Sequence, residues 1–204
     1  MKRNRILLDY ISKYKATYMI IASLFLIGVL IGVIYINIAN QEKIENLSLY
    51  VYELINNVKN NIYKTPMNSI INSIFKNSRE IIIIWFLGCT VIGNYFIYTS
   101  ITYQGFKIGY TIATFINILG TKKGIIVSLS SLLFQNIIYI PTLFLIGESS
   151  IKMCRQTYKN RNNLKREFIR HFLILIICLI LGTVASCIEL YFSTKILIFF
   201  KEIL

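Results

Sequence analysis

The chain has 204 residues, of which 55% are hydrophobic and only 15% are charged, and its formal net charge is +13. Several uncharged runs approach or exceed the roughly 20 residues that a helix needs to cross a hydrocarbon core about 30 Å thick. This composition predicts an all-α, polytopic membrane helix bundle of about five transmembrane helices, and it excludes a soluble enzyme. Lys and Arg collect on the cytoplasmic side of membrane proteins, so the positive charge does not require a nucleic-acid partner.

The first predicted span covers residues 17–38 and follows a segment with five Lys or Arg residues. Its apolar run is longer than the apolar region of a typical signal peptide, which has roughly 7–15 residues, so we expect a retained anchor with a cytoplasmic N-terminus. Gly28 and Gly32 form a GxxxG pattern, which allows two membrane helices to approach closely. Both glycines are therefore candidate helix-packing positions.

Residues 42–63 mix polar side chains with apolar ones that recur at helical spacing. The apolar residues are Ile44, Leu47, Val51, Leu54, Ile55, Val58 and Ile62. The pattern predicts an extracytoplasmic amphipathic helix, which ends before Pro66. Its apolar face either covers the membrane surface or docks a partner. The candidate docking residues are Leu47, Leu54 and Ile55.

The second predicted span, residues 81–102, contains two further glycines that are candidates for helix packing, Gly88 and Gly93. Residues 103–107 read as a tight connection to the next apolar run.

That next run, residues 105–119, is only marginally long enough to cross a bilayer. It either spans fully or forms a broken or re-entrant helix, which only a protein-lined environment tolerates. Gly105 and Gly109 lie where this third span begins, and they complete the set of candidate packing glycines.

The fourth predicted span covers residues 125–147 and contains polar residues and a proline near its middle. Pro141 is expected to kink the helix and to free a backbone carbonyl. We therefore interpret Gln135, Asn136 and Pro141 as candidate structural or polar-core residues.

Residues 148–170 carry seven Lys or Arg residues and read as a cytoplasmic basic loop before the fifth span, residues 171–191. This loop either sets topology and contacts anionic lipid heads or binds a specific partner. Five crossings place it on the same side as the basic N-terminal segment, which leaves the C-terminus extracytoplasmic. Glu189, in the last turns of the fifth span, either belongs to a polar core or reaches the interface.

No catalytic or nucleotide-binding pattern occurs: HExxH, GxSxG, GxGxxG and Walker-type loops are all absent. The sole histidine, His171, lies at a predicted membrane boundary, where a structural role is far commoner than catalysis. The four cysteines, Cys89, Cys154, Cys178 and Cys187, have neither CxxC spacing nor a neighbouring histidine. We therefore expect no enzyme activity, no cofactor and no metal site.

Short glycine-based patterns occur in a characteristic order across residues 74–142. They are Ile74-Phe75-Lys76-Asn77-Ser78, Gly88 with Ile92-Gly93, Gln104-Gly105-Phe106-Lys107-Ile108-Gly109-Tyr110, Phe134-Gln135-Asn136 and Ile140-Pro141. In this order, in length and in the predicted number of spans, the chain resembles the stage II sporulation protein M family over nearly its whole length. Asn77-Ser78 departs from the two asparagines common in the broader family, whereas Gln135-Asn136 is the pairing of its sporulation branch.

The resemblance implies a non-catalytic scaffold in the cell membrane that holds peptidoglycan hydrolases during engulfment in a spore-forming bacterium. The implied partners are stage II sporulation proteins D and P, together with membrane lipid and a possible second copy of the chain. The alternative is a permease subunit of a membrane transporter, in which the proline, the polar pair and the short third run would line a substrate path.

Overall fold

The computed structural model describes residues 2–59, 67–90, 92–159 and 164–199, and its elements are all α-helices. In chain order they are α1 (Lys2–Asn37), α2 (Gln41–Lys59), α3 (Met67–Gly88), α4 (Gly93–Leu119), α5 (Thr121–Lys159) and α6 (Leu164–Phe199). The predicted all-α class is confirmed. The predicted amphipathic helix is α2, although residues 60–63 of the prediction lie outside the described residues.

Three segments within the described residues are long and apolar enough to cross a membrane, which is fewer than the five predicted. They are Lys15–Asn37, Asn136–Thr157 and Leu164–Ile188. Helices α3 and α4 are not among them: polar and charged side chains interrupt their apolar stretches, at Lys76, Arg79 and Glu80 in α3 and at Gln104 and Lys107 in α4.

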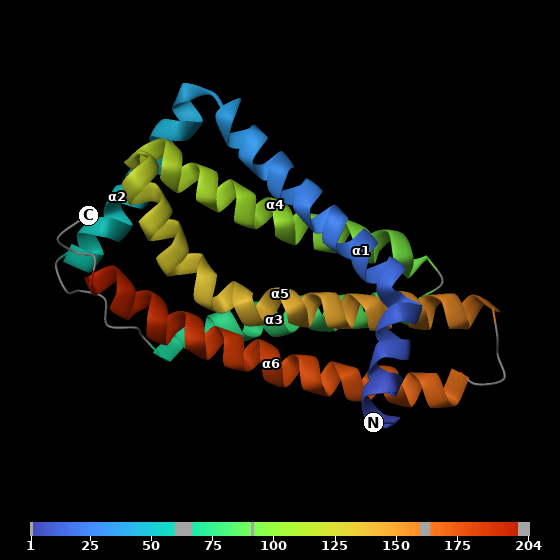
Figure 1. The fold of residues 1–204 in the computed structure, drawn as a ribbon. Coiled ribbons are helices and arrows are strands. Elements are labelled where there is room, and N and C mark those ends of the chain that lie inside the picture. The colour runs from blue at the N-terminus through green and yellow to red at the C-terminus, as the bar shows by residue number, and fades with distance from the viewer. Residues whose placement is uncertain (1, 60–66, 91, 160–163, 200–204) are drawn as a thin grey trace.

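The long helices α1, α3, α4, α5 and α6 run between two ends of the molecule, and each reverses the direction of the one before it (Figure 1). One end holds the start of α1, the α3–α4 turn, the C-terminal end of α5 and the N-terminal end of α6. The opposite end holds α2, the α4–α5 turn and the end of α6. Both basic clusters of the sequence therefore lie at the same end of the bundle.

The predicted connection at residues 103–107 is wrong, because α4 passes through it without a break. The chain instead turns after Gly88, where the amides of Cys89 and Thr90 donate to the carbonyls of Phe86 and Leu87. The boundary between the predicted spans 81–102 and 105–119 therefore moves: α3 ends at Gly88, and α4 runs from Gly93 to Leu119. The glycine that suggested a turn at 105 is instead buried in a helix interior, where its small size serves packing.

The predicted loop over residues 148–170 is also wrong for most of its length, since α5 continues to Lys159 and α6 begins at Leu164. Ser150, Ile151 and Cys154 are each at most 1% exposed, so this part of α5 belongs to the core despite its neighbouring charges. Basic residues share the segment with core residues because one helix presents both an outer and an inner face.

The main hydrophobic core joins α1, α3, α4, α5 and α6. Its fully buried members include Ile21, Ile81, Ile97, Ile101, Leu143, Ile146, Ile151 and Cys178. Pro141 lies inside α5, which bends along its length (Figure 1).

Helices α1 and α4 cross with their backbones in contact. A Cβ atom added at Gly28 would overlap the Thr102 carbonyl of α4, and one added at Gly105 would overlap the Phe25 carbonyl of α1. Gly32 and Gly109 are equally close to backbone of the facing helix. Two GxxxG patterns, one on each helix, therefore form this crossing together, as small residues do in membrane bundles.

We expect Gly105→Ala to destabilise the protein by about 1–3 kcal/mol, because the new methyl group meets backbone atoms that cannot move independently. Gly182→Ala is the matched control: its added Cβ meets only the Cδ1 atom of Ile81, at the far end of a flexible side chain. Unfolding of purified protein in detergent measures both. Equal stability of the two variants would refute close backbone packing at the crossing.

Candidate functional site

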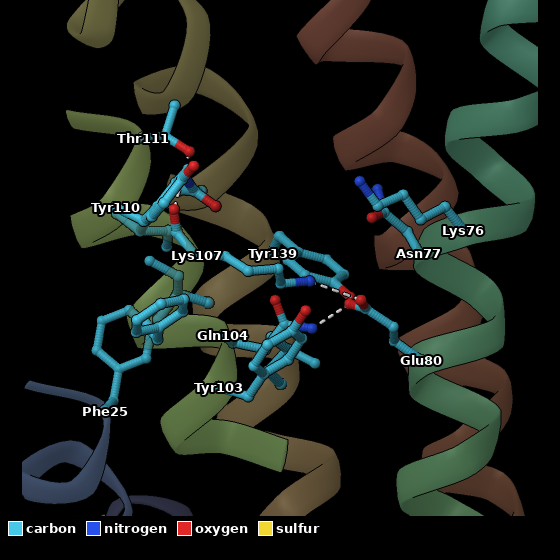
Figure 2. Close-up of a pocket in the computed structure, with 15 residues that line it drawn as sticks. Phe25, Lys76, Asn77, Glu80, Tyr103, Gln104, Lys107, Tyr110, Thr111 and Tyr139 are labelled. Carbon is cyan, nitrogen blue, oxygen red and sulfur yellow. Dashed lines mark hydrogen bonds and ion pairs between the residues drawn. The ribbon is translucent and has the colours of Figure 1, made fainter. Parts of the chain in front are cut away.

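A cluster of polar side chains lies between α3, α4 and α5, around the carboxylate of Glu80 (Figure 2). Lys107 donates to Oε1 of Glu80 at 2.7 Å, and the Tyr139 hydroxyl donates to Oε2 at 2.6 Å. The Nε2 amide of Gln104 also donates to Oε2. One carboxylate thus receives an ammonium, a phenol and an amide from two other helices.

The local sequence explains how these groups meet. Gln104 and Lys107 are three residues apart in α4, so they lie on one face of that helix. Glu80 directly precedes the apolar run of α3, and Tyr139 lies on the inner face of α5 at 4% exposure. The side chains of Glu80 and Lys107 are 19% and 30% exposed, so the pair lies at the edge of the core and not in its centre.

A cavity of about 470 Å³ adjoins this cluster. Besides the four cluster residues, its lining includes Phe25, Lys76, Asn77, Tyr103, Tyr110, Thr111 and Asn136. Figure 2 shows Lys76 and Asn77 on the α3 side and Thr111 and Tyr110 on the α4 side. The cavity is therefore lined by charged, polar and aromatic side chains, and four helices contribute to it.

This arrangement can do two things chemically. It ties α3, α4 and α5 together, because an ionised group placed among apolar helices is stable only when it is paired and hydrogen-bonded. It also presents polar groups to a cavity large enough for a small ligand or a headgroup.

A second buried polar group surrounds His171 on α6. The Ser149 hydroxyl lies 2.8 Å from Nδ1 of the ring, and Nε2 lies 3.2 Å from the Trp85 carbonyl oxygen. A carbonyl only accepts, so Nε2 carries the proton and Nδ1 accepts from Ser149. The ring also stacks on Trp85, with centroids 5.6 Å apart.

The pair of Ser149 and His171 resembles a nucleophile with its base, but its surroundings argue for a structural role. Their exposed fractions are 5% and 2%. The adjoining cavity has a volume of about 10 Å³, which has no room for a substrate. The hydrogen bonds instead join α3, α5 and α6 near the basic end of the bundle.

No group of three or more His, Cys, Asp or Glu residues within the described ranges has an arrangement that could hold a metal ion. The cysteines Cys89, Cys154, Cys178 and Cys187 are free thiols. Cys154 and Cys178 are buried in the core, where they pack as small apolar residues.

The six candidate packing glycines lie at three places in the structure. Gly28, Gly32, Gly105 and Gly109 meet at the α1–α4 crossing. Gly88 is instead close to Ser150 of α5 and His171 of α6, whereas Gly93 is close to the Leu87 carbonyl across the α3–α4 turn.

The other predicted site residues are dispersed. Leu47 is half-buried on α2, but the side chains of Leu54 and Ile55 lie outside the described part of the structure, as do those of Gln135 and Glu189. Asn136 lines the cavity beside the Glu80 cluster, whereas Pro141 is exposed on α5.

Sequence reasoning missed Glu80, Lys107 and Tyr139 as members of one site. Lys107 falls in the predicted connection over residues 103–107, and Glu80 directly precedes the predicted second span. The i, i+3 spacing of Gln104 and Lys107 was an available signal, because it puts two polar groups on one face of any helix that continues through them.

The comparisons with known proteins give one family. A family model described as "Stage II sporulation protein M" matches residues 21–194, which include every residue of the Glu80 cluster. No curated protein and no solved structure matches the chain.

We expect Glu80→Gln and Lys107→Met each to lower the free energy of unfolding by about 1–3 kcal/mol, because each leaves a half-buried partner without its counter-charge. The double variant should lose less stability than the sum of the losses in the two single variants, and we expect this difference to be about 1 kcal/mol or more. Reversible unfolding in mixed micelles measures this coupling, with Lys122→Met at an exposed position as the control for charge loss. Strict additivity would contradict a stabilising ion pair.

Proposed function

Because this chain belongs to the stage II sporulation protein M family, and is thus a sporulation-related membrane protein, we propose that it is the non-catalytic scaffold of an engulfment complex. In this proposal it holds peptidoglycan hydrolases at the mother-cell membrane, and stage II sporulation proteins D and P are the partners. The enzymes are the partners, and this chain supplies their position.

The observation that carries the proposal is the outer surface of α2. Leu49, Tyr50 and Tyr52 are 65%, 68% and 51% exposed, whereas Val51 beside them is buried at 5%. The helix is thus fixed to the bundle through one face and presents large apolar and aromatic side chains on another. Exposed aromatic side chains of this kind are typical anchors for a protein partner.

The location of α2 agrees with that use. It lies at the end of the bundle opposite the start of α1 (Figure 1). If the basic end is cytoplasmic, as the positive-inside rule expects, α2 faces the compartment that contains peptidoglycan.

The orientation is tested by cysteine labelling in intact cells, with the four native cysteines replaced by alanine. A membrane-impermeant thiol reagent should modify Asn46→Cys on α2 and spare Arg166→Cys on α6, because both positions are exposed and lie at opposite ends. Labelling after membrane disruption confirms that Arg166→Cys is reactive. The reverse pattern would place α2 in the cytoplasm and exclude the scaffold geometry.

The docking surface is tested by Leu49→Asp with affinity purification from sporulating cells. We expect unchanged membrane levels and a loss of co-purified hydrolase of at least tenfold, because a charge replaces an exposed apolar anchor. Asn46→Asp adds the same charge on the same helix without removing an apolar side chain, so it should retain the hydrolase. Full recovery with Leu49→Asp would refute docking through this face.

The permease alternative has one observation in its favour, the charged cluster and cavity beside Glu80. Ionisable groups between membrane helices mark substrate paths in many transporters. The same purification separates the two functions: cell-wall hydrolases support the scaffold, and a cytoplasmic ATPase supports the permease.

A further inference from the structure

The cavity beside Glu80 carries more positive than negative charge. Among its described lining residues, the charged side chains are Lys76, Glu80 and Lys107. Glu80 and Lys107 compensate each other at 2.7 Å. The amine of Lys76 therefore gives the cavity its net positive charge.

The polar groups around this charge are suited to an anion. The Glu80 carboxylate is already engaged by Gln104, Lys107 and Tyr139. Lys76 extends from α3 on the opposite side of the cavity from Thr111 and Tyr110 of α4 (Figure 2). A phosphate entering there would meet the ammonium of Lys76, and the Glu80 carboxylate in the same lining is already compensated by Lys107.

The α4 wall of the cavity is aromatic. The rings of Tyr103 and Phe106 stack with centroids 6.3 Å apart, and the ring centroids of Phe106 and Tyr110 are 5.9 Å apart. All three rings line the cavity, as does Phe25 of α1. The cavity thus joins a basic group to an extended apolar surface, which is the combination that binds the headgroup and first carbons of an anionic lipid between membrane helices.

We propose that the cavity between α3, α4 and α5 binds an anionic phosphate group, with Lys76 as the main charge contact and the aromatic wall of α4 beside it. A phospholipid headgroup or a free phosphate ion could supply this chemistry. The site is independent of the scaffold role, because its lining, among the residues that the structure describes, comes from α1, α3, α4 and α5.

The test uses the purified full chain in neutral detergent and follows thermal unfolding through the single tryptophan, Trp85. Phosphatidylglycerol, phosphatidylcholine and inorganic phosphate are titrated separately, and the shift in midpoint gives an apparent affinity. We expect phosphatidylglycerol to stabilise the protein more than phosphatidylcholine. A matching effect of inorganic phosphate would identify the free ion as a sufficient ligand, and a larger effect of the lipid would identify the headgroup with its chains.

Lys76→Gln should weaken the apparent affinity about fivefold or more, as removal of one lysine contact with an anionic headgroup does. Lys76 is exposed, so the variant should fold, and Lys76→Arg should bind within about twofold of the parent chain. Arg79→Gln is the matched control, since Arg79 is exposed on the same helix and does not line the cavity. Stabilisation by neither phosphatidylglycerol nor inorganic phosphate, or equal losses for Lys76→Gln and Arg79→Gln, would overturn the proposal.

Discussion

The contact between Glu80 and the donors Gln104, Lys107 and Tyr139 constrains how three helices meet. A carboxylate removed from water loses hydration worth several kcal/mol, and only close donors restore it. The donors come from α4 and α5, whereas the carboxylate comes from α3. These hydrogen bonds therefore limit the rotation of each helix about its own axis. The apolar core must pack in a way that keeps Glu80 paired with its donors.

Two kinds of packing coexist in the bundle. Helices α1 and α4 meet backbone to backbone through four glycines, whereas α3, α5 and α6 interlock through large side chains such as Ile81 and Leu143. The cavity lies where these regions join, with Phe25 from α1 on one side and Tyr139 from α5 on another. A cavity of about 470 Å³ remains there, beside the hydrogen-bonded Glu80 cluster.

The molecule has two distinct surfaces that could bind other molecules: the outer face of α2 and the cavity beside Glu80. The aromatic surface of α2 is exposed at one end of the molecule and suits a protein partner. The basic and aromatic cavity lies between helices and suits a small anionic group. In the two proposals, the first surface holds a hydrolase and the second binds an anionic phosphate group. Both surfaces depend on the same interior, because α4 packs against α1, contacts α2 and forms the cavity wall.

The sequence by itself determined the helical class, the amphipathic helix and the family, because apolar runs, helical periodicity and short glycine patterns are local signals. It also marked Gly28, Gly32, Gly105 and Gly109 as packing residues, although not which helices they join. Only the tertiary structure decided that residues 103–107 continue a helix, since a glycine in a turn and one in a close helix crossing look alike in sequence. The Glu80 cluster likewise required the fold: its members lie up to 59 residues apart, and no local rule pairs a carboxylate with donors on two other helices.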